Sequence, residues 1–418
     1  MTTELPLLAY VYHPRSFGTL AIVAAAEGRC RILWVIDSSD EEVASMARLL
    51  RRFGTCVDVA GLGLDATAEV VAHFEPRHLL ALADDCLIFA SQLAQRLSLR
   101  FTSPEVAYRF TDKHAQREAL ARGGLAVPRH WVILPKSIGV FDEIDREARF
   151  PAILKPRRGE ASRDTLLVDS KEVLHALWES EGFSRSNRAF VLEEYIPDAE
   201  EPLGGEGFAG YVSVESIVQH SQIRHLAING RMPPAFPFRE TGFFIPAALD
   251  HQLALDVLRV AEGAARSLEV SLGCLHTEIK LTPQGPVVIE VNGRIGGGVP
   301  EMLAAATGVD FLGLAFDVAL GVDIDMDVPI PTPKRLAYLF YVQSPETMSR
   351  VSAVEGLADL RALDGVDEVV LNRGPGAEVS WRFGNHGHVF SVLGTARDHD
   401  ELRRLNTLIS QLVRIEGS

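Results

Sequence analysis

The first hundred residues restrict the fold most, because short apolar runs alternate there with amphipathic stretches. The segments 6–12, 30–36 and 55–61 (PLLAYVY, CRILWVI and TCVDVAG) predict strands, whereas 17–28, 40–54, 65–76 and 85–99 predict helices. Strands that alternate with helices form a parallel sheet covered on both faces. The glycine fingerprint GxGxxG is absent after the first strand, where HPRSFGT stands instead. We therefore predict a Rossmann-like α/β domain without a nicotinamide site.

The pattern changes at two later points. From Ser103 onward helices and strands are mixed, with helices expected over 103–123 and 251–270, strands over 150–155, 189–198 and 210–229, and a helix pair over 300–321. The proline-rich segment 328–334 (VPIPTPK) marks a second boundary, beyond which strand and helix signals alternate up to a final helix at 398–415. The expected division is a first domain over 1–105, a central domain over 106–330 and a small α+β domain over 331–418.

Charge and cysteine usage argue against several classes of protein. The formal charge of −15 disfavours a nucleic-acid binder, which would carry a basic stripe. The four cysteines are scattered without a CxxC pair, which favours reduced thiols over disulfides or a zinc site. No apolar run reaches the roughly 18 residues that a membrane span needs, and the N-terminus lacks the layout of a signal peptide. We expect a soluble cytoplasmic protein that binds neither nucleic acid nor a membrane.

The segment 276–298 (HTEIKLTPQGPVVIEVNGRIGGG) predicts a β-hairpin with two opposed acids. If Leu281 pairs with Val287 around the turn, Glu278 lies opposite Glu290 and His276 opposite Asn292. Like charges directly opposite each other destabilise a sheet, so a cation is expected between them, and such oxygen ligands suit Mg²⁺. The alternative is an ordinary antiparallel sheet with one wet face. Alternation places six residues on the apolar face: Leu275, Ile279, Leu281, Val287, Ile289 and Val291.

Lysines and a polar loop indicate a phosphate site upstream of the hairpin. Lys155 ends an apolar strand (FPAILK), and the small and polar loop 157–165 follows it. Backbone N–H groups and a point charge can hold a phosphate in this arrangement. The Walker pattern GxxxxGK[ST] is absent, and a single lysine is usually a solvated surface residue. The segment LEEYI (192–196) could likewise supply backbone groups to an adenine at a strand end.

Taken together, these segments resemble the ATP-grasp superfamily. TDKHAQREALARGGLAVP, FPAILKPRRGEAS, FVLEEYIPD, HTEIKLTP and IEVNGRIGGG occur in the order and spacing of that superfamily, over about residues 1–330. Within it the chain looks most like the bacterial L-amino acid ligases that form dipeptides. The resemblance implies an ATP-grasp fold with a Rossmann-like N-terminal domain, a two-lobed grasp domain whose small nucleotide lobe covers about 125–197, and a small C-terminal α+β domain.

The resemblance also implies roles for individual residues. Arg294 matches the arginine that steadies the acyl phosphate and the tetrahedral intermediate, and His276 lies near that site, where it could equally be a hydrogen-bonded strand histidine. The metal ligands for Mg²⁺, or for Mn²⁺, correspond to Glu278, Glu290 and Asn292. The residues that match the nucleotide site are Lys113, Lys155, Ser162, Glu193, Glu194, Tyr195, Ile196 and Tyr211.

Two departures from the superfamily pattern concern ATP binding. Ala161 and Asp164 stand where the phosphate loop usually carries glycine, so a stiffer loop is expected. Tyr211 stands where an acid that binds ribose is expected, and Glu215 lies nearby at a different position. The effect of both changes on ATP affinity is left open.

The expected activity is that of an ATP-dependent carboxylate–amine ligase. It would form an amide, as in a dipeptide, through an acyl phosphate, with ATP and a small carboxylate and amine, both expected to be amino acids, as its partners. The first alternative is a carboxylase or formate-activating enzyme of nucleotide metabolism, and the second is a degenerate nucleotide-binding regulatory protein. The oligomeric state is open, with a homodimer as one option.

Overall fold

The computed structural model describes residues 5–135, 139–179 and 187–418. Its N-terminal part contains a parallel sheet of four strands in the order β3-β2-β1-β4, which confirms the expected α/β arrangement. Helix α2 begins after Asp40, whose carboxylate accepts hydrogen bonds from the backbone N–H groups of Glu42 and Val43. The elements are β1 (Leu7–Val11), α1 (Thr19–Ala26), β2 (Arg31–Ile36), α2 (Glu41–Leu50), β3 (Thr55–Asp58), α3 (Leu64–Ala72), β4 (His78–Leu80) and α4 (Asp84–Arg96).

A small lobe follows two connecting helices, α5 (Pro104–Thr111) and α6 (Lys113–Arg122). Its antiparallel sheet has the order β5-β8-β6-β7, and helices pack against it through a core that contains Trp131 and Trp178. The side chain of Asp112 caps α6, because its carboxylate accepts from the backbone N–H of Ala115. The lobe comprises β5 (His130–Ile133), α7 (Gly139–Glu147), β6 (Ala152–Pro156), β7 (Leu166–Val168), α8 (Lys171–Glu179) and β8 (Phe190–Glu194).

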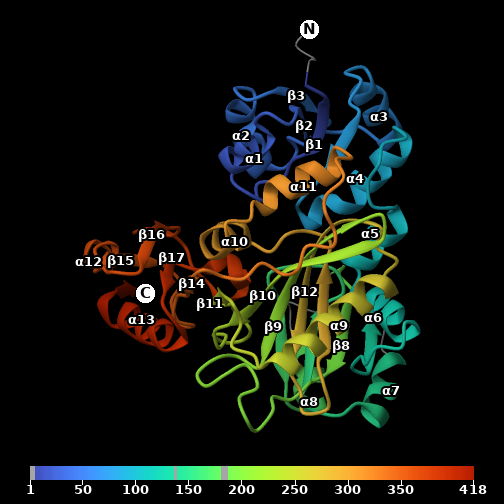
Figure 1. Cartoon of the computed structure of the whole chain (residues 1–418). Coiled ribbons are helices and arrows are strands. Elements are labelled where there is room, and N and C mark those ends of the chain that lie inside the picture. The colour runs from blue at the N-terminus through green and yellow to red at the C-terminus, as the bar shows by residue number, and fades with distance from the viewer. Residues whose placement is uncertain (1–4, 136–138, 180–186) are drawn as a thin grey trace.

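The central and C-terminal parts of the chain share one eight-stranded sheet with the strand order β13-β12-β9-β10-β11-β14-β17-β16. Strand β14 pairs with β11, so the sheet continues across the expected boundary near residue 330 (Figure 1). Its strands are β9 (Tyr211–Gln219), β10 (Gln222–Arg231), β11 (Gly242–Ile245), β12 (Leu272–Lys280), β13 (Val287–Asn292), β14 (Leu336–Val342), β16 (Val366–Leu371) and β17 (Phe390–Ala396). The other C-terminal elements are β15 (Val351–Glu355), α12 (Leu357–Arg361), the 3₁₀ segment η1 (Trp381–Gly387), α13 (His399–Leu412) and β18 (Arg414–Gly417).

The hairpin β12–β13 has the expected acid pairing but a different register at its turn. Glu278 lies opposite Glu290 and His276 opposite Asn292, as predicted. The register then shifts, so that Ile279 pairs with Val288 and Lys280, rather than Leu281, with Val287. A β-bulge at Ile289 inserts one extra residue and reverses the alternation beyond it. The prediction that Val287 and Ile289 belong to the apolar face was therefore wrong: Val288 is the fully buried residue there.

Two apolar helices of the predicted helix pair connect the large sheet to the N-terminal part. Helix α10 (Val299–Thr307) and helix α11 (Phe311–Ala319) are packed into the same core as β1 and α1, and Phe316 stacks on Tyr10 with ring centroids 6.3 Å apart. Figure 1 shows α11 against the blue N-terminal part. Helix α9 (His251–Ser267) packs on β9, β12 and β13. Within the described ranges no single helix is long and apolar enough to cross a membrane. Helices α10 and α11 together meet the length and composition expected of a membrane span, but the chain bends by 112° between them.

Candidate active site

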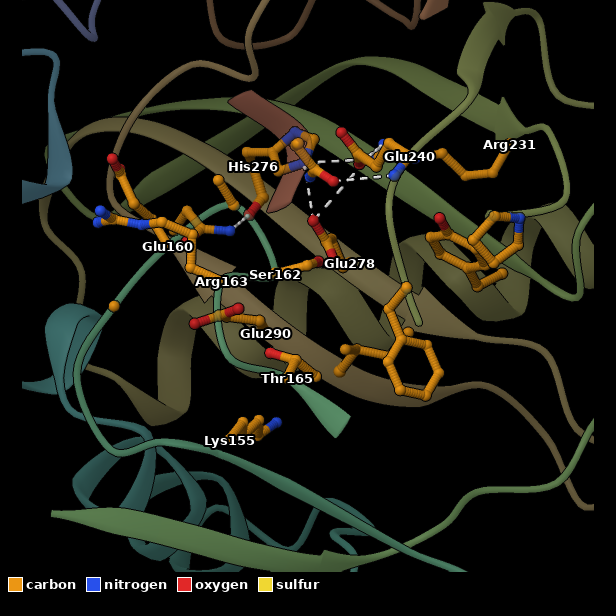
Figure 2. Close-up of a pocket in the computed structure, with 18 of the residues that line it drawn as sticks. Lys155, Glu160, Ser162, Arg163, Thr165, Arg231, Glu240, His276, Glu278 and Glu290 are labelled. Atoms are coloured by element: carbon orange, nitrogen blue, oxygen red, sulfur yellow. Dashed lines mark hydrogen bonds and ion pairs between the residues drawn. The ribbon is translucent and has the colours of Figure 1, made fainter. Parts of the chain in front are cut away.

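One cavity of about 670 Å³ lies between the small lobe, the large sheet and the C-terminal segment (Figure 2). The sequence singled out thirteen candidate residues, and the structure brings all of them to its wall. They come from α6, from three strands of the large sheet and the loop after β13, and from the small-lobe strands with the loops that follow them. These residues are Lys113, Lys155, Ser162, Glu193, Glu194, Tyr195, Ile196, Tyr211, His276, Glu278, Glu290, Asn292 and Arg294.

The opposed carboxylates form the acidic part of the cavity. Glu290 lies 2.8 Å from the Nζ atom of Lys113, which begins α6. Burial alone would raise the pKa of Glu278, but hydrogen bonding to His276 and the charge of Arg231 lower it to about 2. The amide nitrogen of Asn292 donates to the carbonyl of His276 at 3.5 Å, which leaves the amide oxygen free to accept or to ligate. Two carboxylates and an amide oxygen form a donor set that fits Mg²⁺ or Mn²⁺.

A buried triad holds Lys155 in place beside this acidic part. Its Nζ atom lies 2.7 Å from Glu193, and the same carboxylate oxygen accepts from Arg117 at 3.0 Å. Burial lowers the pKa of Lys155, and Glu193 opposes that effect. Burial would also raise the pKa of Glu193, but Arg117 and Lys155 hold it at about 2. Glu193 is therefore a carboxylate that fixes the positions of two cations. The strand that contains it continues toward Tyr195.

The loop that follows Lys155 adopts an uncommon backbone conformation. Ala161, Ser162 and Asp164 all have left-handed φ angles, of 58°, 55° and 54°. Non-glycine residues seldom adopt this region, because the Cβ atom crowds the backbone. The loop is braced from outside: the backbone N–H of Asn385 donates to the carbonyl of Ala161 at 2.9 Å. The C-terminal segment η1 thus helps to hold the loop in a left-handed backbone conformation, which glycine would adopt at a lower steric cost.

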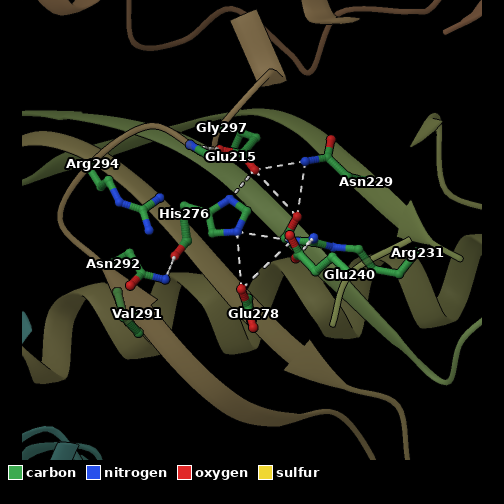
Figure 3. A network of polar contacts seen from close by, with 12 residues as sticks. Glu215, Asn229, Arg231, Glu240, His276, Glu278, Val291, Asn292, Arg294 and Gly297 are labelled. Atoms are coloured by element: carbon green, nitrogen blue, oxygen red, sulfur yellow. Dashed lines mark hydrogen bonds and ion pairs between the residues drawn. The ribbon is translucent and has the colours of Figure 1, made fainter. Parts of the chain in front are cut away.

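A buried polar network surrounds His276 (Figure 3). Its Nδ1 atom lies 2.5 Å from Glu215 on the neighbouring strand β9, and its Nε2 atom lies 3.4 Å from Glu278. Burial alone would lower the pKa of His276, but these carboxylates, Glu215 foremost, raise it to about 9. Arg231 is buried in the same network, where it pairs with Glu240. The Nε2 atom of His276 also lies 3.0 Å from a guanidinium nitrogen of Arg231, whose charge opposes this shift. The raised pKa favours the imidazolium form at neutral pH, in which neither ring nitrogen has a free lone pair for a general base.

Arg294 is fixed by a residue from the N-terminal part of the chain. Its Nε atom donates to Asp84 at 2.6 Å, and Asp84 is the first residue of α4. The sequence analysis missed this partner, although acids at the carboxyl ends of parallel strands are frequent in functional sites. It also missed Arg117, whose position four residues after Lys113 places both on one helix face. The other lining residues without a sequence prediction include Asp198, Arg231, Glu240, Asn385, His386 and His388.

Comparison with known proteins relates this cavity to a described domain. Residues 110–298 match the model of the ATP-grasp domain family. The chain is 25% identical over 247 residues to alanine–anticapsin ligase of Bacillus subtilis, covering 54% of this chain and 50% of that protein. It is 27% identical over 268 residues to carnosine synthase 1 of Gallus gallus, covering 59% and 27%. The matched segment contains every one of the thirteen candidate residues.

The fold resembles that of a solved L-amino acid ligase from Bacillus licheniformis. The two structures superpose with a TM-score of 0.79 at 19% identity, and the match covers 100% of both chains. At this identity the similarity establishes the shared fold alone. The chain spans between 27% and 61% of the length of the curated relatives that it matches.

Proposed function

We propose that this chain, which contains an ATP-grasp domain, is an ATP-dependent carboxylate–amine ligase. The observation that carries the proposal is the pairing of Glu278 with Glu290 across one hairpin, with Lys113 and Lys155 facing the same cavity. Acidic oxygen ligands beside two lysines match the needs of a metal–nucleotide complex. Arg294, immediately beyond the hairpin, adds a cation where a phosphoryl group would be transferred.

In the proposed reaction, a carboxylate oxygen of the first substrate attacks the γ-phosphorus of ATP. The bond from that phosphorus to the bridging oxygen breaks, which yields an acyl phosphate and ADP. The nitrogen of an amine then attacks the acyl carbon, the carbon–oxygen bond to phosphate breaks, and the nitrogen loses a proton as the amide forms. Amino acids are our proposed substrates, because the names of two similar proteins, alanine–anticapsin ligase and L-amino acid ligase, describe ligases of amino acids.

The residues of the chain would act mainly by position and charge. Lys113 and Lys155 would contact nucleotide phosphates, and the loop 157–165 would cover them. Magnesium, held by Glu278, Glu290 and Asn292, would supply positive charge to the phosphate oxygens. At the other end of the cavity, Tyr195 and Ile196 would face the adenine. In-line phosphoryl transfer needs little covalent assistance from a protein, so positioning of this kind can account for catalysis.

His276 and Arg294 would stabilise negative charge on the reacting groups. His276 is held as a cation by Glu215, so we assign it an electrostatic role and no proton abstraction. The cavity is lined by Leu82 from the N-terminal part and by His388 from the C-terminal part, in addition to the grasp lobes. Enclosure from several sides would restrict water, which would otherwise hydrolyse an acyl phosphate.

Release of phosphate from ATP, with Mg²⁺ and amino acids offered in pairs, tests the proposal. We expect release only with a productive pair, together with a new amide detected by mass spectrometry. Glu290→Gln should nearly abolish turnover while the circular dichroism spectrum is unchanged, whereas Glu269→Gln, at an exposed position, should have no effect. Phosphate release with bicarbonate or formate but no amino acid would favour the alternative enzymes. Nucleotide binding without turnover on any acid would refute catalysis.

A further inference from the structure

A second cluster of metal-binding side chains lies outside the catalytic cavity. His114 and Glu118 on α6 and His130 on β5 place one ligand atom each within 4.8 Å of one another. The Nδ1 atom of His114 is 3.0 Å from the Nε2 atom of His130, and Glu118 is 4.0 Å from that same Nε2 atom. Two imidazole nitrogens on one tetrahedral Zn²⁺ ion lie about 3.3 Å apart, given metal–nitrogen bonds of about 2.0–2.1 Å. The observed separation is within a few tenths of an ångström of that value.

The helix places this cluster away from the catalytic residues. His114 and Glu118 are four residues apart and therefore share one face of α6. Lys113 and Arg117 form the neighbouring face, which lines the catalytic cavity. His114 and Glu118 instead line a separate groove between α5 and α6. The same helix thus serves two sites.

The orientation of His130 suits a metal ligand. Its Nδ1 atom lies 3.4 Å from the carbonyl of Pro128, which can accept a hydrogen bond from it. That hydrogen bond places the proton on Nδ1 and the lone pair on Nε2, the atom that faces His114 and Glu118. Two arginines of the groove are already paired: Arg109 with Glu269 at 2.6 Å and Arg157 with Asp112 at 2.8 Å.

We propose that His114, Glu118 and His130 form a binding site for Zn²⁺ or a similar transition metal ion, separate from the Mg²⁺ site. Two imidazoles and one carboxylate favour such an ion over Mg²⁺, and three protein ligands leave one position for water. A bound ion would link α6 to β5. Because β5 pairs with β8 at His130 and Glu193, it would also fix the strand that anchors Lys155. The site would therefore couple metal binding to the placement of both lysines.

Titration of the full-length protein with Co²⁺, followed by its visible d–d absorption, tests the site. Excess Mg²⁺ is present throughout, so that the carboxylates of the catalytic cavity are occupied by Mg²⁺. We expect one Co²⁺ per chain with the intense band of a tetrahedral site, displaced by Zn²⁺. His114→Ala and His130→Ala should each weaken binding by roughly tenfold or more. Circular dichroism and thermal unfolding show whether these variants remain folded.

Two matched variants separate the possible outcomes. His175→Ala removes a half-buried histidine that also faces a carboxylate, Asp145 at 3.1 Å, and should keep the full band. Glu290→Gln should keep it too, because that residue belongs to the other site. Equal affinity in the wild type, His114→Ala and His130→Ala would overturn the proposal. Loss of the band in Glu290→Gln would also overturn it, since the ion would then occupy the catalytic cavity. Neither result depends on ligase activity.

Discussion

Replacement of Glu193 by glutamine tests whether one buried carboxylate holds the cations of the nucleotide site. The residue is 4% exposed, and its carboxylate contacts both Lys155 and Arg117. Glutamine has nearly the same shape but no charge, so the substitution leaves two cations without their shared partner. Removing one partner of a buried ion pair typically costs about 3–5 kcal/mol. We expect a loss of this size in the free energy of unfolding at pH 7.

The pKa of Glu193 gives a second value for its contribution to stability and the direction in which that contribution changes with pH. A fall from 4.5 in the unfolded chain to about 2 in the folded chain corresponds to about 3 kcal/mol. Burial lowers the pKa of Lys155, so the cost of burying the ammonium offsets part of this stabilisation. A carboxylate with a lowered folded pKa stabilises above its unfolded pKa, and the effect is lost as the pH falls through the folded pKa. The wild type should therefore lose about 1 kcal/mol more than Glu193→Gln between pH 7 and pH 3.5.

Urea unfolding followed by tryptophan fluorescence measures this difference. Trp131 and Trp178 lie in the small-lobe core and contribute to this signal together with Trp34 of the N-terminal core. Glu194→Gln is the matched control, because the half-buried carboxylate of Glu194 accepts from the backbone N–H of Arg149 and contacts neither cation. A stability difference between the wild type and Glu193→Gln that stays constant from pH 7 to pH 3.5 would refute the reasoning, as would an equal loss in Glu194→Gln.

Three further predictions concern the histidine network, the bracing segment and the glycine run. The pKa of His276 is raised from 6.5 to about 9, which corresponds to about 3 kcal/mol of stabilisation by its charge. This stabilisation is fully present below pH 6.5 and is lost as the pH rises through 9. His276→Gln should therefore destabilise the protein more at pH 6 than at pH 9.5, as measured by thermal unfolding. A Cβ atom on Gly384 would lie 2.1 Å from the carbonyl of Ala161, so Gly384→Ala should raise the Kd of ATP in calorimetry, whereas Gly376→Ala, which has open space around it, should leave the Kd unchanged. Gly297 lines the cavity with nothing within 4 Å of an added Cβ, so Gly297→Trp should discriminate against large substrates by about 1–3 kcal/mol in kcat/KM. Gly298 has a φ angle of 72° and would clash with Leu339 at 2.2 Å, so Gly298→Trp should instead lower the Tm and reduce activity on all substrates alike.

The hairpin illustrates how far alternation alone can predict a site. Glu278 and Glu290 are the only acids in their strands, so any antiparallel pairing that buries the apolar residues places them on the same face. The bulge escaped prediction because Val287, Val288 and Ile289 are three consecutive β-branched residues. Each suits either face of a strand, so the pattern does not fix which one is the extra residue. The acid pair was thus predictable, whereas the local register was not.

Residues that reach the cavity from distant segments of the chain were harder to predict from the sequence. Strand β4 has three residues, too short for a periodic signal, and without it Asp84 could not be placed at the carboxyl end of a parallel strand. The helix pair over 300–321 was expected, but its packing against β1 and α1 was not, because an all-apolar helix does not indicate which surface covers it. Asn385 and His388 reach the cavity through contacts between remote segments, and no local pattern encodes such contacts.

The charges of the cavity indicate a role for carboxylates from distant segments of the chain, which pair with its cations. In the structure, four cations that line the cavity each have a carboxylate partner: Lys113 with Glu290, Lys155 with Glu193, Arg231 with Glu240 and Arg294 with Asp84. Three of these carboxylates are not candidate metal ligands, so their cations can stay paired when a nucleotide binds. Lys113 and Glu290 differ, because each is also a candidate ligand, one for a phosphate and the other for a metal ion. These two residues would therefore separate on binding of the metal–nucleotide complex, each exchanging the other for a ligand of opposite charge. Such an exchange leaves neither Lys113 nor Glu290 without a partner of opposite charge in either state, which avoids the cost of an unpaired buried charge.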